Sequence, residues 1–554
     1  MKEIRARRVL TDAAVCLIAA ALILSVCSMT SFLFPLHDRV DQNVFYTIGR
    51  EMLEGRVVYR DMPEQKGLYV YLLHELAAAV DPTHMIGMYL IQTVFYAALL
   101  YFVLMFFKGE YSVSDGIGKG RGPGPCSGKA QADGKAPAAG LFAASRFSPY
   151  MYMLLFGVVC ACTQCYLRGD NVEEFILPFF MLTFLMLSTR FCRRHPCLFM
   201  LAEGMIVGLA FWIKFSMLGF WLVWFILHFV WLFIQKRPAL VFRDLGMFLA
   251  GFGALTLPVI VYCAVKGCLY DMFYWYFYAN IVLYSRGSSF FYKLGQLCLS
   301  VFKNLGQNPV YFILIHLGLA DMIREMARAL RRRKDVRGFG RRLMAEVRES
   351  ESFRLQTVLV LGYAGLFLGM YGGGVWYDYY YLIAAPYVLF GICSLRDCLL
   401  RPVVRVREFF AGHAVAAVCV LALCTVVFGN CIKYYGKSRD DYVQTQFGAV
   451  MKEAGADSML NYGFIDQGFY LASGTRPVNK FFFTLNISEE KLPEMYAEQR
   501  ELVAARAVDY IVIRVKKSQT ISDYKEAWVL DYYEVCAEGV SIGDNYRFYL
   551  LKAG

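Results

Sequence analysis

Hydrophobic residues fill this chain in long runs, and short polar segments separate one run from the next. A helix that crosses the roughly 30 Å hydrocarbon core of a bilayer needs about 20 mostly apolar residues. The runs that approach this length lie at 9–34, 85–107, 149–167, 174–190, 198–213, 215–234, 245–266, 308–323, 355–371, 379–395 and 410–431. The pattern predicts an α-helical polytopic membrane protein with about 11 spans.

The first run follows a basic start with Lys2, Arg5, Arg7 and Arg8. A cleaved signal peptide would begin in the same way, but its apolar part is shorter and ends in a small-residue cleavage site. The run at 9–34 is too long and lacks a clean site of that kind. We therefore expect a retained first span.

Composition agrees with a membrane protein. Of the 554 residues, 58% are hydrophobic and only 18% are charged, which is too apolar for a soluble protein of this size. The net charge of +12 is uneven: 432–554 holds 15 Lys+Arg against 17 Asp+Glu, which leaves 42 against 28 for 1–431. Such an excess is typical of basic cytoplasmic loops and not of a nucleic-acid-binding face.

The basic clusters fall in alternate loops, at 108–147, 190–196, 235–243, 324–342 and 396–407. With eleven spans they all lie on one side, so the positive-inside rule places the N-terminus in the cytoplasm and the C-terminus outside the plasma membrane. The segment 108–147 is rich in Gly, Ala, Lys and Ser, which predicts a disordered loop. The stretch 324–342 could contact anionic lipid, but a solvated loop explains it as well.

Two domains are expected. Residues 1–431 form the membrane module, and 432–554 lose the span-length hydrophobicity. In this second part, strand-like pieces ("SMLNYGF", "VDYIVIRV", "YRFYLLKA") alternate with a helical one ("EEKLPEMYAEQRELVAARA"). Such alternation predicts a small extracytoplasmic α/β domain.

The 17 cysteines do not indicate a disulfide framework or a metal centre. Most of them lie in apolar runs, where cysteine behaves as a small hydrophobic residue. Cys160, Cys162 and Cys165 have spacing that resembles a metal site, but no matching second pair follows.

The segment 38–67 carries eleven charged side chains between apolar runs. Between 41 and 53 the apolar residues recur at helical spacing, which predicts a helix that lies along the membrane surface. The apolar stretch 66–80 is too short to span the bilayer and predicts a second interfacial helix. Together they make a large first outer loop that holds acids and a lysine at the lipid boundary.

Later outer segments add further polar groups: Arg168, Asp170, Glu173 and Glu174 in "YLRGDNVEEF", then Lys214, Arg286, and the cluster "YDYYY" at 377–381. Each has a simpler explanation. Aromatic clusters form interface belts, a lone lysine can reach toward head groups, and loop acids can be solvated. Their convergence on one face nevertheless favours a substrate path, because ionisable groups at membrane depth are costly.

Chemistry on a lipid phosphate would need both charges. A cation holds the phosphate and stabilises it as it leaves, and a carboxylate activates the acceptor hydroxyl. Asp41 together with Lys66, Arg168 and Lys214 supplies both kinds of group.

The segment "DQNVFYTIGREMLEGRVVYRDMPEQKGLYVYLLHEL" resembles the first outer loop of bacterial GT-C glycosyltransferases. The branch is family 39-like, similar to dolichyl-phosphate-mannose protein mannosyltransferases and aminoarabinose transferases. The positions that match its motif are Asp41, Phe45, Gly49, Gly55, Tyr59, Asp61 and Lys66. Looser likenesses follow in order: "RGDNVEEFILPF", "GLAFWIKFSMLGF" and "NYGFIDQGFYLASGTRPVNKFFF". The chain departs from the motif at Val58, Gly67 and Leu68, where the family usually has proline.

The resemblance implies a GT-C membrane module and an inverting transfer from a polyprenyl-phosphate-linked sugar to an extracytoplasmic acceptor. Asp41 would be the catalytic base or would orient the acceptor, and Lys66, Arg168 or Lys214 would bind the donor phosphate. The acids that would support the acceptor or a metal are Asp170, Glu173 and Glu174. Further donor contacts would come from Tyr59, Asp61, Arg286, Tyr379 and Tyr380.

Some alternatives stay open at this point. The acceptor is a protein, a lipid or a glycan, and membrane lipids are the remaining partners. A divalent metal is possible, and the sequence does not show whether the reaction requires one. A transporter, flippase or ligase of lipid-linked glycans would also need many spans. Transporters often carry internal repeats with broken helices, and the sequence shows no such repeat.

Overall fold

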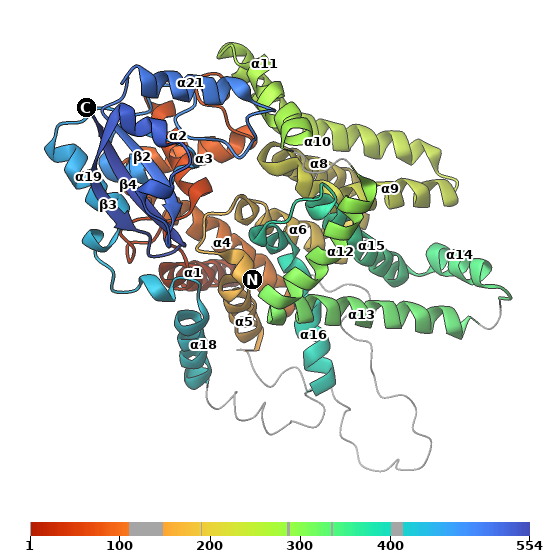
Figure 1. Ribbon diagram of the computed structural model, residues 1–554. Helices are drawn as coiled ribbons and strands as arrows, with labels where there is room; N and C mark the ends of the chain where they lie inside the picture. Colours follow the sequence, from red (N-terminus) through yellow and green to blue (C-terminus); the bar gives the residue numbers. More distant parts are fainter. Residues whose placement is uncertain (1, 110–147, 190, 285–288, 334–335, 400–413) are drawn as a thin grey trace.

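The computed structural model describes residues 2–109, 148–189, 191–284, 289–333, 336–399 and 414–554 (Figure 1). The predicted disordered loop lies outside the described residues from 110 onward, and so does Arg286. The described part is mainly helical, with one small sheet near the C-terminus.

Each predicted span coincides with a helix among the described residues. These helices are α1 (Lys2–Cys27), α4 (Ile86–Lys108), α5 (Ser148–Cys162), α6 (Leu177–Ser188), α8 (Pro196–Lys214), α9 (Gly219–Ile234), α10 (Pro238–Val265), α13 (Pro309–Arg332), α15 (Glu351–Tyr371), α16 (Val388–Leu399) with the preceding 3₁₀ segment η6 (Asp378–Tyr387), and α18 (Ala414–Phe428). Within the part of the chain that the structure describes, six segments are long and apolar enough to cross a membrane, and α8 and α9 count together as one of them. Shorter apolar helices include α5, α6 and α18.

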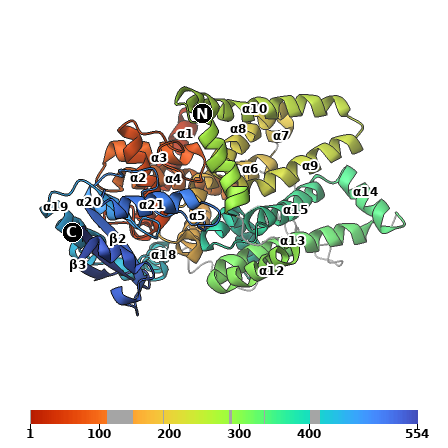
Figure 2. The same cartoon turned by 45° about the horizontal axis from the view of Figure 1, so that its top comes forward.

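Several bounds differ from those expected. Helix α1 ends at Cys27, seven residues before the predicted end of the first span at Phe34. The stretch 324–342 is not a plain loop, because α13 continues to Arg332 and α14 (Phe339–Glu349) follows it. Arginine is a good helix former, so a basic segment can extend a span beyond the apolar part. Figure 2 shows α14 at the end of the molecule away from the sheet.

Short connecting elements complete the helical part. They are α7 (Phe191–Arg194), α11 (Leu269–Met272), the π-helix η5 (Phe273–Leu283), α12 (Phe290–Gln307), and the 3₁₀ segments η2 (Gln164–Tyr166), η3 (Val172–Phe175) and η4 (Phe215–Leu218). The sequence interpretation missed α12, whose apolar face is interrupted by Lys293 and Lys303 and so lacks a span-like run.

Small residues let membrane helices approach closely. At the contact of α8 with α10, a Cβ atom on Gly204 would overlap the carbonyl oxygen of Phe248, and one on Gly251 would overlap that of Leu201. Such close backbone contact is a common way for helices to pack inside a bilayer. It fixes the end of α8, where Lys214 lies.

The large first loop contains the two helices expected from the sequence, α2 (Val40–Leu53) and α3 (Leu68–Val80). They pack against each other where Gly49 meets the backbone of His74, and a Cβ atom at Gly49 would overlap that backbone. Residues 54–67 connect the two helices, and we call this connection the α2–α3 loop. It carries Lys66 and Gly67.

The last part of the chain, residues 432–554, contains a four-stranded sheet that we call the sheet domain. Its strands are β1 (Met459–Asn461), β2 (Tyr510–Lys516), β3 (Tyr533–Val540) and β4 (Tyr546–Ala553), in the order β1-β2-β4-β3. Strand β1 runs parallel to β2, and the other pairs are antiparallel. Helices α19 (Val443–Glu453), α20 (Phe469–Ser473) and α21 (Pro493–Ala504) accompany it, with short turns at η7 (Ile432–Tyr434), η8 (Arg439–Asp441), η9 (Ile521–Asp523) and η10 (Ala527–Asp531).

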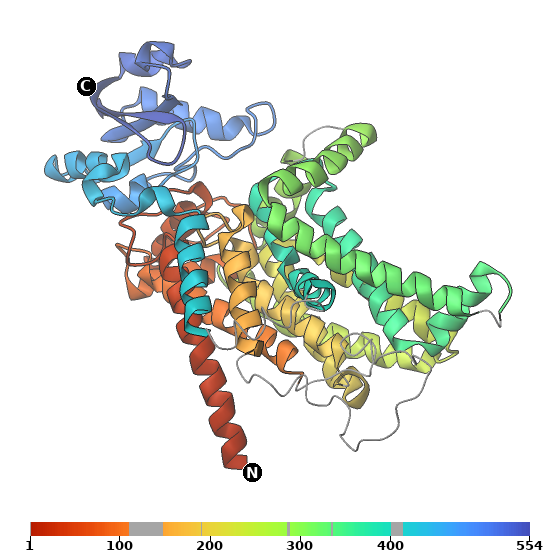
Figure 3. The ribbon, with the colours of Figure 1, turned by 90° about the horizontal axis from the view of Figure 1, so that it is seen from below.

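The sheet domain lies against the first loop. Arg50 donates to the carbonyl oxygen of Thr475 at 2.9 Å, and Arg56 donates to those of Pro477 at 2.7 Å and Asn479 at 3.2 Å. Figure 3 shows the N-terminus and the sheet domain at opposite ends of α1. The first loop is therefore enclosed between the membrane helices and the sheet domain.

Candidate functional site

Asp41 lies in the first turn of α2, and two groups from other elements converge on it. The hydroxyl of Tyr379, from η6, donates to its Oδ2 at 3.2 Å, and Nζ of Lys66 lies 4.0 Å from the same oxygen. The Asp41 side chain keeps 30% of its surface exposed. A carboxylate that is held in place but still open to solvent can accept a proton from a bound substrate.

Lys66 is positioned by its backbone. The next residue, Gly67, donates its N–H to the carbonyl oxygen of Ile213 at 3.2 Å, and a Cβ atom at 67 would overlap the carbonyl of Trp212. The hydroxyl of Tyr59 donates to the carbonyl oxygen of Lys66 at 2.8 Å. The missing side chain at 67 thus lets the α2–α3 loop reach the end of α8.

The ammonium group of Lys66 stays charged in this position. Glu64 lies 3.9 Å from its Nζ, and the ring of Phe45 lies 5.2 Å away. Burial alone would lower the pKa of Lys66, but the carboxylates of Glu64 and Asp41 outweigh it, so the pKa rises above the usual lysine value. Lys66 is therefore a cation whenever the site meets an anionic ligand.

Lys214, the last residue of α8, supplies a second cation. Its Nζ lies 2.6 Å from Oε1 of Glu173 and 3.6 Å from the ring centre of Tyr380. The ring of Tyr379 is 4.8 Å away, so one tyrosine touches both Asp41 and Lys214. Oε2 of Glu173 is buried with no hydrogen-bond partner. These residues form one cluster with Asp41 and Lys66, which we call the Asp41 cluster.

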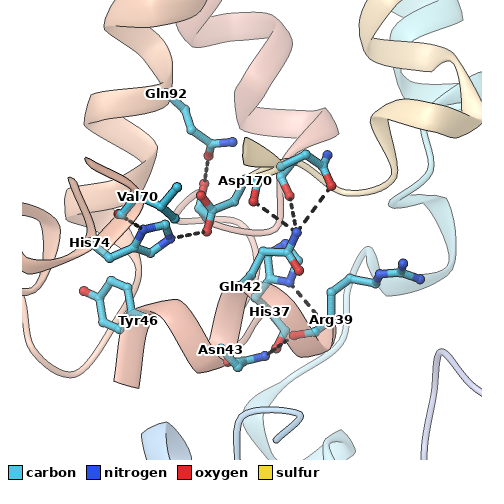
Figure 4. Close-up of polar contacts among 12 residues, drawn as sticks. His37, Arg39, Gln42, Asn43, Tyr46, Val70, His74, Gln92 and Asp170 are labelled. Carbon is cyan, nitrogen blue, oxygen red and sulfur yellow. Dashed lines mark hydrogen bonds and ion pairs between the residues drawn. The ribbon is translucent and has the colours of Figure 1, made fainter. Parts of the chain in front are cut away.

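Asp170 does not face this cluster. It is fully buried, with φ of 62°, and its Oδ2 lies 3.3 Å from Nε2 of His74 on α3 (Figure 4). His74 in turn contacts the carbonyl oxygen of Val70 at 2.8 Å, and Gln42 donates to the backbone carbonyl of Asp170 at 3.0 Å. Burial raises the pKa of the Asp170 carboxyl. Asp170 therefore joins α3 to the turn that carries Glu173.

Glu174 accepts hydrogen bonds from neighbouring protein groups and does not face the Asp41 cluster. Its Oε1 accepts from the backbone N–H of Asn171 at 2.8 Å, while Oε2 accepts from Gln92 at 2.8 Å and from Tyr166 at 3.0 Å. The first of these bonds belongs to a capping box at the start of η3. Glu174 thus fixes the turn from which the neighbouring Glu173 reaches Lys214.

Arg168 is paired elsewhere. Its Nε lies 2.8 Å from Oδ1 of Asp38, and its guanidinium group stacks 5.2 Å from the ring centre of Tyr434 in η7. Tyr434 also donates to Asp38. Arg168 therefore links the first loop to the beginning of the sheet domain, and within the described residues it pairs with Asp38 and not with Asp41.

Tyr59 and Asp61 support the α2–α3 loop. Tyr59 is fully buried with φ of 72°, and Asp61 accepts from the backbone of Val57 at 2.8 Å and pairs with Arg60 at 2.8 Å. Tyr59 reaches the Asp41 cluster only through the backbone carbonyl of Lys66, and Asp61 holds the loop and not the cluster. Arg286 lies outside the described residues.

The structure adds residues that sequence reasoning missed. The carboxylate of Glu64 offsets the positive charge of Lys66. Its position two residues before that lysine could have indicated the pair. His74 contacts Asp170 from the middle of an apolar helix, where a lone histidine gives no reliable signal. Among the described residues, no three His, Cys, Asp or Glu side chains are grouped in a way that could hold a metal ion.

No family model matches the sequence, and no curated protein sequence matches it. Among solved structures, ArnT from Cupriavidus metallidurans in the apo state is similar, with a TM-score of 0.56 and 11% identity, over 99% of this chain and 98% of ArnT. The structure of that ArnT bound to undecaprenyl phosphate gives 0.54 and 12%, over 98% and 97%.

An oligosaccharyltransferase from Archaeoglobus fulgidus gives a TM-score of 0.46 at 12% identity, over 97% of this chain and 73% of that one. The likeness to ArnT extends over almost the full length of both chains, which at such low identity shows a shared fold. The chain therefore shares the fold of this ArnT, and the expected helical architecture with a small C-terminal sheet domain is confirmed.

Proposed function

We propose that this protein is a membrane glycosyltransferase that takes its sugar from a polyprenyl-phosphate-linked donor. The observation that supports this most strongly is the Asp41 cluster. One carboxylate and two lysines from three separate elements meet at the first loop, within a fold shared with an ArnT whose structure holds undecaprenyl phosphate.

In this proposal the two lysines bind the phosphate of the donor. Lys66 and Lys214 carry the positive charge, and a phosphate that enters between them gains charge-assisted hydrogen bonds. Both ammonium groups are already paired, with Glu64 and Glu173, so they are oriented before the donor arrives. Pre-organised cations stabilise the charge that develops on a leaving group without reorganisation during the reaction.

Asp41 acts on the acceptor. Its Oδ2 takes the proton of an acceptor hydroxyl, the acceptor oxygen forms a bond to the anomeric carbon, and the bond from that carbon to the phosphate oxygen breaks. The electron pair of the broken bond remains on the polyprenyl phosphate, beside the lysines. Attack from the side opposite the leaving group inverts the anomeric configuration. Tyr379 keeps the carboxylate aimed, because its hydroxyl donates to the same oxygen.

The test uses purified protein in phosphatidylcholine nanodiscs with radiolabelled undecaprenyl-phosphate hexoses and pentoses. We expect protein-dependent release of undecaprenyl phosphate from at least one donor. A parallel experiment in proteoliposomes follows the intact donor between leaflets. Movement of uncleaved donor, with no release from any member of the panel, would contradict the proposal and would identify a transporter.

A further inference from the structure

A second polar site lies between the first loop and the sheet domain. It is an open cavity of about 520 Å³, within the range of roughly 300–1,000 Å³ that small-molecule sites occupy. One wall is the end of α2 with the start of the α2–α3 loop, and the other is the segment 476–480 of the sheet domain. We call it the interdomain cavity.

Basic side chains predominate in its lining. Arg56, Arg60, Arg476 and Lys480 face only two acids, Glu51 and Asp61. Two of these arginines have close acidic partners, since Arg60 pairs with Asp61 at 2.8 Å and Arg476 with Glu54 at 2.7 Å. The other two cations are less well balanced.

Arg56 and Lys480 carry that surplus charge. Arg56 donates hydrogen bonds to the backbone carbonyls of Asp61, Pro477 and Asn479, which carry no charge. The carboxylate oxygen nearest to its guanidinium group belongs to Glu51 and is 3.9 Å away. Among the described residues, no carboxylate lies within ion-pair distance of Lys480, whose Nζ instead lies 5.8 Å from the ring centre of Trp275 and 5.4 Å from that of Phe481. An anionic group of a ligand would neutralise the positive charge of these two side chains.

Glu51 indicates a further property of the ligand. Its side chain is only 2% exposed, yet it lines the cavity and its Oε1 has no hydrogen-bond partner. A buried carboxylate oxygen without a donor is costly, and a ligand hydroxyl could supply that donor. A ligand with both an anionic group and hydroxyl groups would satisfy the cavity, and acidic sugars have both.

The distance to the Asp41 cluster sets the size of this ligand. Glu51 follows Asp41 by ten residues on the same helix, and a rise of 1.5 Å per residue puts them about 15 Å apart along α2. A single sugar cannot reach from one to the other. We infer that the interdomain cavity binds the acidic part of an extended glycan acceptor, whose distal hydroxyl reaches Asp41.

This inference rests on the proposed function only where it calls the glycan an acceptor. Binding of the glycan to the cavity can be measured without any sugar transfer. The probes are a galacturonate tetramer, a maltose-type tetramer of the same length without carboxylates, and inorganic phosphate. Affinity is measured by microscale thermophoresis on the full chain in phosphatidylcholine nanodiscs. The variant is Lys480→Gln, and Lys516→Gln is the matched control, because it removes the same charge from an exposed position of β2 outside the cavity.

We expect the acidic tetramer to bind, the neutral tetramer to bind at least about tenfold more weakly, and Lys480→Gln to weaken the acidic tetramer by about tenfold. Lys516→Gln should leave its affinity unchanged. Equal binding of acidic and neutral tetramers, or binding of phosphate alone, would overturn the inference. Equal losses in both variants would also overturn it.

Failure of the proposed function would look different. Release of undecaprenyl phosphate should persist in Lys480→Gln when water replaces the acceptor, because the donor site is intact. If the unmutated protein released nothing while the acidic tetramer still bound in the predicted order, the transferase proposal would fail and the cavity would remain a glycan site.

Discussion

At the scale of single residues, the Asp41 cluster brings together charged groups that would each be costly to remove from water alone. Each lysine has its own acidic neighbour, Glu64 for Lys66 and Glu173 for Lys214. This pairing offsets part of the cost of removing an ammonium group from water. The phosphate of a donor can then share the lysines with acids that are already in place, whereas Asp41 keeps an exposed face for the acceptor.

Lys66→Gln is expected to weaken binding of undecaprenyl phosphate by about tenfold, because hydrogen bonds to a charged group contribute roughly 1.5–3 kcal/mol. Equilibrium binding with a fluorescent undecaprenyl phosphate measures it. Lys437→Gln is the control, since it removes an equal charge from an exposed turn of the sheet domain. A similar loss in both variants would mean that overall charge, and not the site, governs binding.

The contribution of Lys66 to this binding should not depend on pH near neutrality. Neighbouring carboxylates raise the pKa of Lys66 above its usual value of 10.5, so the cation persists from pH 7 to 9. We expect the contribution of Lys66 to the affinity for undecaprenyl phosphate, measured as the difference between the unmutated protein and Lys66→Gln, to stay level over that interval.

Which polar residues come together could be predicted from the sequence only in part. Asp41, Lys66, Glu173, Lys214, Tyr379 and Tyr380 do meet in one cluster. Arg168, Asp170 and Glu174 come from the same short segment as Glu173 but point to other partners. The direction of each side chain depends on the turn at 167–171, where Leu167, Gly169 and Asp170 all have positive φ, and residue spacing does not reveal such a turn.

At the scale of elements, the site depends on how closely the α2–α3 loop approaches the end of α8. Gly67 makes that approach through its backbone, which explains why a residue without a side chain occupies this position. The related motif usually has proline after its lysine, so the sequence alone suggested a departure from the family. The structure gives the departure a physical reason.

Gly67→Ala should therefore reduce donor binding without changing any charged group. The added methyl group would overlap the carbonyl of Trp212, which forces the loop and Lys66 away from Lys214. We expect at least a tenfold weaker affinity for undecaprenyl phosphate. Gly373→Ala is the control, because a methyl group there meets nothing within 4 Å. Unchanged affinity in Gly67→Ala would show that the contact with α8 does not position Lys66.

The sheet domain contains its own titrating group. Asp466 is fully buried at the start of α20, where its Oδ1 accepts from Asn461 at 2.7 Å and from the backbone of Phe469 at 3.0 Å. Burial raises its pKa from 3.8 to about 6. The folded state thus holds this proton more tightly than the unfolded state does.

The free energy of unfolding should consequently be largest below pH 3.8 and fall as pH rises to 6, by roughly 3 kcal/mol from this group. Asp466→Asn keeps the accepting oxygen but cannot ionise, so it should flatten thermal stability between pH 4 and 6. Asp457→Asn, at an exposed position, should not. An identical decline in both variants would rule out Asp466 as its source.

Elements with strong periodicity were the easiest to predict. The spans, the two helices of the first loop and three strands of the sheet follow from apolar patterns in the sequence. Strand β3 was missed because its residues are mostly exposed and do not alternate, and a register shift between Val535 and Ala537 interrupts its pairing. The basic continuation of α13 beyond its apolar part was also missed, because a basic helical segment shows no apolar pattern in the sequence.

At the scale of the whole molecule, the arrangement separates two ends. The first loop, which carries Asp41 and Lys66, contacts the sheet domain through Arg50 and Arg56, and the N-terminus lies at the other end of α1 (Figure 3). The positive-inside rule predicts that the cluster lies outside the cytoplasm. That side is the expected meeting place of a lipid-linked donor with an envelope acceptor.

The orientation can be measured with a native cysteine. Cys536 on β3 and Cys298 on α12 are both exposed, so the experiment uses a Cys298→Ser background. A membrane-impermeant maleimide should label this variant in intact cells, and adding Cys536→Ser should remove the label. Labelling only after the cells are permeabilised would place the sheet domain in the cytoplasm and would contradict the proposed topology.

The central claim is that the Asp41 carboxylate drives transfer while the lysines hold the donor. Asp41→Asn tests it directly, because the amide keeps the shape of the side chain but cannot take a proton. In nanodiscs with radiolabelled undecaprenyl-phosphate sugar, we expect the transfer rate to fall by about 100-fold or more, with the affinity for undecaprenyl phosphate within about twofold of the unmutated protein. Transfer at the full rate in Asp41→Asn would contradict the account.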